Sequence, residues 1–167
     1  FKIVTWNVNS LSAKFSANIT RRISESSIPR DPEKVLSLEN WLSLNSPHVL
    51  AVQEAWVASN FTLPDCGYRM HHKVSQFNNS WSQAFLIKRD VTTVRFGHVG
   101  NDILFSMYVV VCLPGAGYLA IFNVYVPNGT LGKNSELGKR VRALYEALNA
   151  NILEFKKFKY SVLVMGD

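Results

Sequence analysis

Two carboxylates and two amides stand at the ends of apolar segments of this sequence, where a folded chain could use them for chemistry. Asn7 and Asn9 come at the end of the first apolar segment, and Glu54 closes the second one. Asp167 follows the last apolar segment. Functional side chains gather where rigid strands open into loops. Carboxylate and amide oxygens suit a hard cation, so the sequence predicts a site for Mg²⁺ or Mn²⁺.

A phenol and a third amide, Tyr125 and Asn128, lie at the end of another apolar segment. Taken one at a time, these residues also have structural interpretations. Asparagine closes many turns, tyrosine is common in sheets, and a terminal aspartate can cap a helix. The repeated placement of polar groups after apolar segments is what favours a chemical role for the set.

Histidine and cysteine indicate neither a zinc site nor a disulfide framework. Among the four histidines only His71 and His72 are close in sequence, and an adjacent pair is common in loops and strands. Cys66 and Cys112 are far apart. Two distant cysteines favour a reducing compartment, so an intracellular location is expected.

The strands that must position the polar residues follow from the periodicity of apolar residues. Strands are expected over residues 2–8, 49–52, 83–88, 103–113, 118–126 and 160–165. The turn at Pro114–Gly117 between two of them predicts a hairpin, and therefore a largely antiparallel sheet. Residues 52–69 are expected to form mostly loop.

Two helices are expected between these strands. Asp31-Pro32-Glu33 is typical of a helix start, with an N-cap followed by proline, and Asn45-Ser46-Pro47 ends that helix. One face of a second, long helix carries apolar residues at helical spacing: Val141, Leu144, Tyr145, Leu148, Ile152 and Phe155. This order of elements predicts an α/β domain whose sheets are covered by helices.

Composition places the chain among globular proteins with a basic surface. Of its 167 residues, 47% are hydrophobic and 18% are charged, which fits a single folded domain. No apolar segment approaches the ~20 residues of a membrane span, so no membrane association is expected. Lysine and arginine outnumber aspartate and glutamate by 18 to 12, giving a net charge of +6. This excess favours a polyanionic partner such as nucleic acid.

Five segments, in the same order along the chain, resemble the motifs of one nuclease superfamily. They are Lys2–Leu11, Val49–Glu54, Trp81–Lys88, Phe122–Gly129 and Val162–Asp167. The chain is similar to the endonuclease/exonuclease/phosphatase superfamily, closest to exonuclease III, the AP endonucleases and the endonucleases of LINE-type retrotransposons. The resemblance implies a four-layered α/β sandwich, with two mainly antiparallel sheets between helices, of which residues 1–167 form an incomplete part.

The resemblance also implies which residues handle the metal. Glu54 is expected to bind it, with Asn9 nearby, although AP endonucleases carry aspartate at that second position. Asn7 is expected to orient a phosphate oxygen or a metal-bound water.

Three further residues acquire catalytic roles from the same resemblance. Tyr125 and Asn128 are expected to contact the phosphate that is cleaved, and Asp167 to position or activate the attacking water. Hydrolysis of a phosphodiester needs these parts, because a cation and donors must stabilise charge on phosphate oxygens while a water is held in place.

The chain departs from the superfamily pattern in other places. Ser82 and Gln83 stand where a Gly-Val pair is usual, which is a packing change. The asparagine after Gly-Asp and a later Ser-Asp-His are absent, because the sequence ends at Asp167. The chain alone is therefore expected to be inactive, with a C-terminal segment or a partner chain completing the fold. The rival interpretation is a catalytically silent nuclease-fold subunit with a structural or RNA-binding role.

A basic, serine-rich insertion at about residues 12–33 contains Arg21 and Arg22. These arginines are the predicted contacts to a nucleic-acid backbone, and a solvated variable loop is the other interpretation. The predicted activity is metal-dependent cleavage of a nucleic-acid backbone, with DNA favoured over RNA. An AP-endonuclease-like enzyme and a retrotransposon-type endonuclease are the two alternatives. The nucleus is the favoured location, with the mitochondrion as the alternative.

Overall fold

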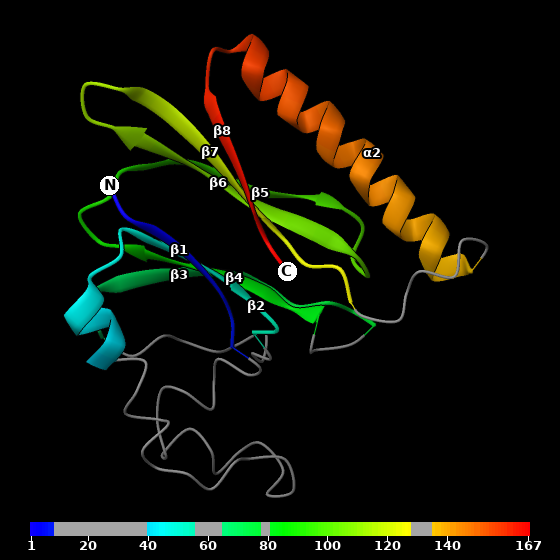
Figure 1. Ribbon diagram of the computed structural model, residues 1–167, viewed down its shortest axis with the longest axis horizontal. Coiled ribbons are helices and arrows are strands. Elements are labelled where there is room, and N and C mark those ends of the chain that lie inside the picture. Colours follow the sequence, from blue (N-terminus) through cyan, green and yellow to red (C-terminus); the bar gives the residue numbers. More distant parts are fainter. Residues whose placement is uncertain (9–39, 56–64, 78–80, 128–134) are drawn as a thin grey trace, which may run out of the picture.

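The computed structural model describes residues 1–8, 40–55, 65–77, 81–127 and 135–167. In these ranges, eight strands form two four-stranded sheets that pack against each other (Figure 1). The strands are β1 (Ile3–Asn7), β2 (Val49–Gln53), β3 (Tyr68–Lys73), β4 (Gln83–Lys88), β5 (Thr93–Gly100), β6 (Phe105–Leu113), β7 (Gly117–Val124) and β8 (Ser161–Gly166). The long helix is α2 (Glu136–Lys157), and residues 40–45 form a short helical segment.

Both sheets combine antiparallel pairs with one parallel pair. The first sheet has the order β1-β2-β4-β3, in which β1 and β2 run parallel and the other neighbours are antiparallel. The second sheet has the order β5-β6-β7-β8, in which β7 and β8 run parallel and the other neighbours are antiparallel. The expectation of an α/β sandwich with mainly antiparallel sheets is therefore confirmed.

A buried apolar layer lies between the two sheets. Its members come from β2, β4, β6 and β7, with one residue from the turn after β4: Val49, Ala51, Phe85, Ile87, Val91, Phe105, Met107, Val109, Val111 and Ile121. Successive side chains of a strand point to opposite faces, so the intervening residues of these strands lie on the outer faces of the sheets. All five residues of β2 are buried, which explains why that strand is almost continuously apolar.

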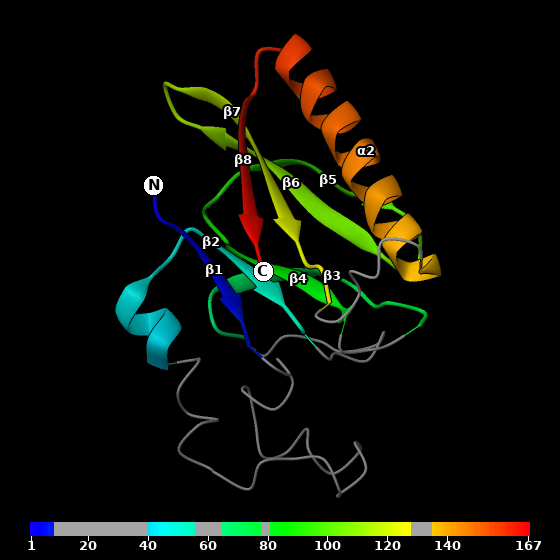
Figure 2. The ribbon, with the colours of Figure 1, turned by 45° about the vertical axis from the view of Figure 1, so that its right-hand side comes forward.

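Helices cover the outer face of each sheet, and the molecule therefore has four layers (Figure 2). Leu42 in the short helical segment packs against Leu50 and Val52 on the outer face of the first sheet. Leu148 and Phe155 of α2 pack on the outer face of the second sheet. No helix in the described ranges is long and apolar enough to cross a membrane.

α2 begins earlier than its apolar stripe because a cap starts it. The Oγ of Ser135 accepts a hydrogen bond from the backbone N–H of Gly138 at 3.0 Å, which satisfies a donor that the first turn leaves open. Glu136 in the first turn and Lys156 and Lys157 in the last complement the helix dipole.

The sequence pattern does not predict two of the strands, β3 and β5. The prediction of loop over residues 52–69 is wrong at its end, where β3 begins. β3 begins at Tyr68 and carries mostly polar, half-buried residues, so it shows no apolar run. β5 is largely exposed and contains two glycines, which weaken any periodicity. Both are held by pairing with a buried neighbour, β4 or β6, and that pairing is non-local information.

Candidate active site

The ends of four strands meet at one rim of the sandwich and bring four polar side chains together. β1 and β2 end there in the first sheet, and β7 and β8 end there in the second. Figures 1 and 2 both place the end of β8 beside the first sheet, and β1 and β8 are in contact. Because parallel strands deliver their carboxyl ends to the same edge, residues that follow them become neighbours across the two sheets.

Asn7 joins the two acidic residues of this rim. Its Nδ2 donates to Oε1 of Glu54 at 3.0 Å and to Oδ2 of Asp167 at 2.8 Å. One amide group thus holds a carboxylate from each sheet, and it fixes the spacing between them. The structure therefore brings together the acid pair that the sequence pattern singles out.

Glu54 adopts a backbone conformation that side chains other than glycine rarely take. Its φ is 51°, in the left-handed region, directly after the end of β2. The backbone N–H of the next residue, Ala55, donates to the carbonyl oxygen of Ser82 at 2.9 Å, which anchors the turn. Such strain costs about 1–3 kcal/mol and is commonly found at functional positions. The turn aims the carboxylate toward Asn7 and Tyr125 rather than along the strand.

Tyr125 completes the set from the second sheet. Its side-chain hydroxyl donates to Oε1 of Glu54 at 2.8 Å, and the residue is buried. Burial raises the pKa of the Tyr125 phenol well above its ordinary value, and the hydrogen bond to Glu54 and the nearby charges of Glu54 and Asp167 raise it further. The phenol is therefore protonated at all physiological pH values and acts as a donor.

Asp167 is placed by a tight backbone connection between β7 and β8. Its N–H donates to the carbonyl of Val124, and its own carbonyl accepts from the N–H of Val126, both at 3.0 Å. Gly166 precedes it with φ 149°, and a Cβ there would lie 1.8 Å from the carbonyl oxygen of Val124. Glycine is thus required at this position for β8 to deliver Asp167 to the rim.

Buried amides directly beneath the rim link the two sheets. Gln53 donates through Nε2 to Oδ1 of Asn123 at 2.5 Å and to the Thr5 hydroxyl at 2.9 Å. Asn123 is fully buried, and its Nδ2 donates to the carbonyl oxygens of Val52 at 2.9 Å and Ala84 at 3.3 Å. A buried network with its partners satisfied favours one relative placement of the sheets.

Gln83 makes a second link of the same kind. Its Nε2 donates to the carbonyl of Phe105 at 2.6 Å, and its Oε1 accepts from the N–H of Met107 at 3.2 Å. The replacement of Gly-Val by Ser82-Gln83 is therefore more than a packing change, because it adds a polar crosslink between the sheets. Sequence reasoning missed Gln83 and Asn123 as site supports, since a single amide inside an apolar strand gives no signal of its distant partner.

The donor set fits a hard divalent cation. Oε1 of Glu54 accepts the hydrogen bonds from both Asn7 and Tyr125, so these two donors leave Oε2 for a metal. Asp167 offers a second carboxylate across the bridge made by Asn7. Oxygen ligands of this type suit Mg²⁺ or Mn²⁺. In the described part of the chain, no group of three or more His, Cys, Asp or Glu side chains forms a metal-binding cluster.

Four other predicted site residues lie outside the described residues. They are the metal-site residue Asn9, the phosphate contact Asn128, and the backbone contacts Arg21 and Arg22. Their predicted roles stay predictions.

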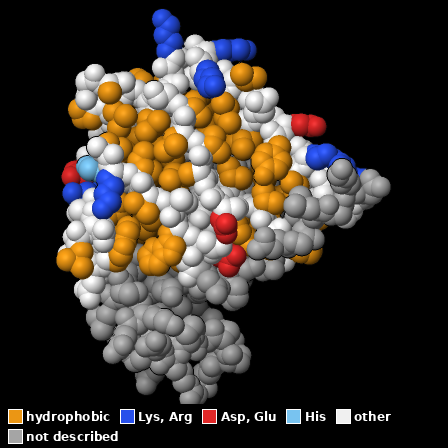
Figure 3. Space-filling view, in the orientation of Figure 1, with side chains coloured by type: hydrophobic (Ala, Val, Ile, Leu, Met, Phe, Trp, Pro, Cys, Tyr) orange, Lys and Arg blue, Asp and Glu red, His pale blue; other side chains and the backbone are white. Residues whose placement is uncertain are grey.

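An apolar groove adjoins Asp167 between β8 and α2. Its lining includes Val126, Tyr145, Leu148 and Val164, and Tyr145 and Val164 are about half exposed. Figure 3 shows broad apolar areas on this face, with acidic side chains at their lower border. The acidic rim is thus bordered by a surface of the kind that proteins usually cover.

The chain belongs to the endonuclease/exonuclease/phosphatase family, whose model matches residues 4–167. Among solved structures, it is similar to an AP endonuclease from Archaeoglobus fulgidus, with a TM-score of 0.61 and 21% identity over 100% of this chain and 56% of that one. A 3'-5' exonuclease (NExo) from Neisseria meningitidis gives a TM-score of 0.63 and 19% identity over 100% of this chain and 57% of that one.

A more distant likeness is TDP2 from Caenorhabditis elegans, with a TM-score of 0.56 and 13% identity over 82% of this chain and 43% of that one. At these identities the likenesses show a shared fold. A sequence search among curated proteins finds no match. The chain spans little more than half the length of the AP endonuclease and the exonuclease.

Proposed function

We propose that the protein is a divalent-metal-dependent phosphodiesterase that cleaves a nucleic-acid backbone, with DNA as the favoured substrate. One observation carries the proposal: Asn7 bridges the carboxylates of Glu54 and Asp167 at the rim where four strands end. Acids and amides held this way suit a hard cation that would stabilise charge on a phosphate.

Each residue of the rim has a defined part in this proposal. Glu54 would hold the cation, whose charge offsets the negative charge that grows on phosphate oxygens during hydrolysis. Tyr125, whose hydroxyl keeps its proton because its pKa is raised, orients the Glu54 carboxylate through a 2.8 Å hydrogen bond. Asp167 would orient the attacking water and accept its proton. Asn7 holds the two acids at a fixed spacing, which would keep the cation and the attacking water in a fixed relation to each other.

The choice of nucleic acid as substrate draws on charge and on the similar structures. The chain carries a net charge of +6, which favours binding to a polyanion. One similar structure is a Neisseria 3' phosphatase NExo variant bound to a product DNA hairpin. The abasic-site and retrotransposon-type alternatives belong to this same chemistry and differ only in how the substrate is chosen.

We also propose that residues 1–167 work together with further polypeptide, from the same protein or from a partner. Support comes from the 56% share of the AP endonuclease structure that the chain covers, and from the apolar groove beside Asp167. A groove lined by half-exposed Tyr145 and Val164 is a surface that additional chain would bury.

The proposal is tested by assaying the full-length protein with Mg²⁺, and with EDTA, on three substrates. These are duplex DNA with an abasic site, the unmodified duplex, and single-stranded RNA. We expect Mg²⁺-dependent cleavage of DNA that falls at least about 10²-fold in Asn7→Ala, because both carboxylates lose their positioning donor. The matched control is Asn149→Ala, which removes an exposed amide from α2.

Two results would contradict the proposal. Cleavage that is equal with Mg²⁺ and EDTA would exclude a metal-dependent site. Tight RNA binding without cleavage of any of the three substrates would support the silent, RNA-binding subunit instead.

A further inference from the structure

An aromatic pair, with one exposed and one partly buried member, lies near the rim and outside the set of residues described above. Phe77 is 68% exposed, and its ring lies 5.0 Å from the ring of Trp81, with an angle of 34° between their planes. Covering an exposed aromatic ring of this size with a partner would be favourable, because it would remove apolar surface from water. Phe77 and Trp81 are here called the aromatic pair.

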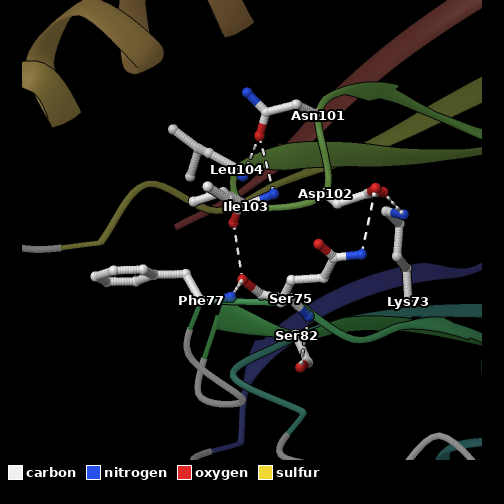
Figure 4. Close-up of polar contacts among 9 residues, drawn as sticks. Lys73, Ser75, Phe77, Ser82, Asn101, Asp102, Ile103 and Leu104 are labelled. Carbon is white, nitrogen blue, oxygen red and sulfur yellow. Dashed lines mark hydrogen bonds and ion pairs between the residues drawn. The ribbon is translucent and has the colours of Figure 1, made fainter.

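A network of hydrogen bonds holds the backbone beside Phe77 (Figure 4). The Ser75 hydroxyl donates to the carbonyl of Ile103 at 2.8 Å and accepts from the N–H of Phe77 at 3.3 Å. Lys73 pairs with the Asp102 carboxylate at 2.7 Å. These contacts tie the segment after β3 to the turn between β5 and β6, so Phe77 is presented by a fixed backbone.

One backbone hydrogen bond links the residue that follows Trp81 to the residue that follows Glu54. Trp81 precedes Ser82, whose carbonyl accepts from the N–H of Ala55, the residue after Glu54. Summing two Cα–Cα steps of 3.8 Å and one interstrand spacing gives a separation of at most about 13 Å between the Cα atoms of Glu54 and Trp81. In duplex DNA, successive phosphates of one strand are about 3.4 Å apart along the axis, so this separation spans at most about four nucleotides.

Phe77 and Trp81 line one side of a small apolar pocket. Its other walls are Ile103 at the β5–β6 turn and Leu137 and Arg140 in the first two turns of α2, with Glu136 at its border. The cavity measures about 240 Å³. Sites for drug-sized ligands measure about 300–1,000 Å³, so this one suits a single flat ring system rather than a whole nucleotide.

We propose that this pocket takes an unpaired base of a nucleic-acid strand whose phosphodiester lies at the Glu54–Asp167 rim. Phe77 and Trp81 supply the ring faces on which a base stacks. The Arg140 guanidinium is a planar group that also stacks on rings, and it is held by an ion pair with Glu136 at 3.6 Å. The inference rests on the proposed function and narrows its substrate to strands with an unpaired nucleotide at most about four nucleotides from the cleaved bond.

The pocket lining has no net charge that would hold a phosphate, because the Arg140 guanidinium is paired with the Glu136 carboxylate. Glu136 is largely exposed at its border and would repel a phosphate, whereas its carboxylate can accept from the amino group of a base. The apolar walls of Ile103 and Leu137 offer a phosphate no donors, and they exclude water around a stacked ring.

The test measures binding to the full-length protein in Ca²⁺ buffer without turnover. The probe is a short single strand that carries 2-aminopurine, whose fluorescence falls when it stacks, and the comparison is the same strand in a full duplex. We expect quenching with the single strand, and affinity for it that falls about 5- to 100-fold in Phe77→Ala. Affinity for the duplex should change less than twofold. Phe77→Tyr keeps the ring and should bind as wild type does.

Phe158→Ala is the matched control, because Phe158 is 62% exposed at the opposite end of α2. Equal affinity of Phe77→Ala and wild type for the single strand, or an equal loss with the duplex, overturns the inference. The inference is also overturned if Phe77→Ala lowers the affinity equally for a strand that carries an abasic residue in place of 2-aminopurine. Failure of the proposed function is seen separately, as failure of the wild type to hydrolyse bis(p-nitrophenyl) phosphate with Mg²⁺, a substrate without a base.

Discussion

Asn7 and Asp167 are separated by 160 residues in the sequence, yet Nδ2 of Asn7 lies 2.8 Å from Oδ2 of Asp167. The two residues end strands of different sheets, β1 and β8, so their hydrogen bond crosses the interface of the sandwich. A site made in this way depends on the relative placement of the sheets. It is therefore sensitive to changes in residues that never touch a substrate.

Glu54→Gln is expected to lower Mg²⁺-dependent turnover of the full-length protein by at least about 10²-fold. The variant keeps an oxygen that can accept from Asn7 and Tyr125 but loses the charge that would hold a cation. Initial rates against Mg²⁺ concentration measure the effect, and the melting temperature should change little. Glu146→Gln, an exposed acid in α2, is the control. Wild-type rates in Glu54→Gln would refute the assignment.

Glu54 also offers a test of backbone strain. Its φ of 51° costs an alanine about 1–2 kcal/mol, whereas glycine adopts this conformation freely. Glu54→Gly should therefore have a free energy of unfolding about 1 kcal/mol higher than Glu54→Ala, although both lack activity. Urea denaturation of the two variants measures the difference, and equal midpoints would show that the turn is unstrained.

Tyr125→Phe is expected to lower turnover about tenfold or more, because Glu54 loses one of the two donors that orient it. The same variant changes the dependence of stability on pH. The pKa of Tyr125 is raised in the folded protein above its ordinary value near 10, so this residue contributes no pH dependence below pH 10. Above it, the unfolded chain ionises first, and the fold loses stability.

The measurement for Tyr125 is the free energy of unfolding at pH 8 to 11. Wild type should lose more stability above pH 10 than Tyr125→Phe does, while Tyr118→Phe at the exposed hairpin should resemble wild type. Parallel curves for wild type and Tyr125→Phe would contradict the raised pKa.

Gly166→Ala is expected to lower the free energy of unfolding by about 2–4 kcal/mol and to reduce activity with it. The new Cβ would lie 1.8 Å from the carbonyl oxygen of Val124, so β8 must shift and carry Asp167 away. Gly115→Ala has a φ of 75° and no atom within 4 Å, and it should cost only about 1–2 kcal/mol of backbone strain. Equal losses in the two variants would show that the crowding at Gly166 is relieved without cost.

Asn123→Leu is expected to destabilise the fold by about 3 kcal/mol or more. It removes the hydrogen bonds that Asn123 makes with buried groups on β2 and β4, among them those with the carbonyl of Val52 and the amide of Gln53. Chemical denaturation measures the loss, and Asn149→Leu on the exposed face of α2 is the control. Near-equal stability of the two variants would mean that the network between the sheets contributes little.

Sequence reasoning found the parts of this site whose signals are local. Glu54 and Asp167 each follow a strand with a clear apolar pattern, and family resemblance supplied the expectation that they meet. β4 was predicted with its observed bounds, because its apolar run is bounded on both sides. β3 and β5 could not be predicted, since their residues are mostly polar or exposed and only pairing with β4 and β6 makes them strands.

The amides beneath the rim show a second limit. Gln53 ends a buried strand, and Asn123 lies inside another, 70 residues further along the chain. Each would be destabilising alone, because a buried amide without partners costs free energy. Only the pairing of β2 against β7 across the interface makes them favourable, and no spacing in the sequence records that pairing.

The long separation of Asn7 from Asp167 has a consequence for how the protein is made. Ribosomes add about 5–20 residues per second, so Glu54 emerges on the order of ten seconds before Asp167. β8 joins its sheet only after α2 has brought the chain back to β7. We expect nascent chains stalled before residue 167 to show no nuclease activity, which a ribosome-bound assay can measure. The pair of acids that would hold a cation and a water is therefore brought together only after synthesis has reached Asp167.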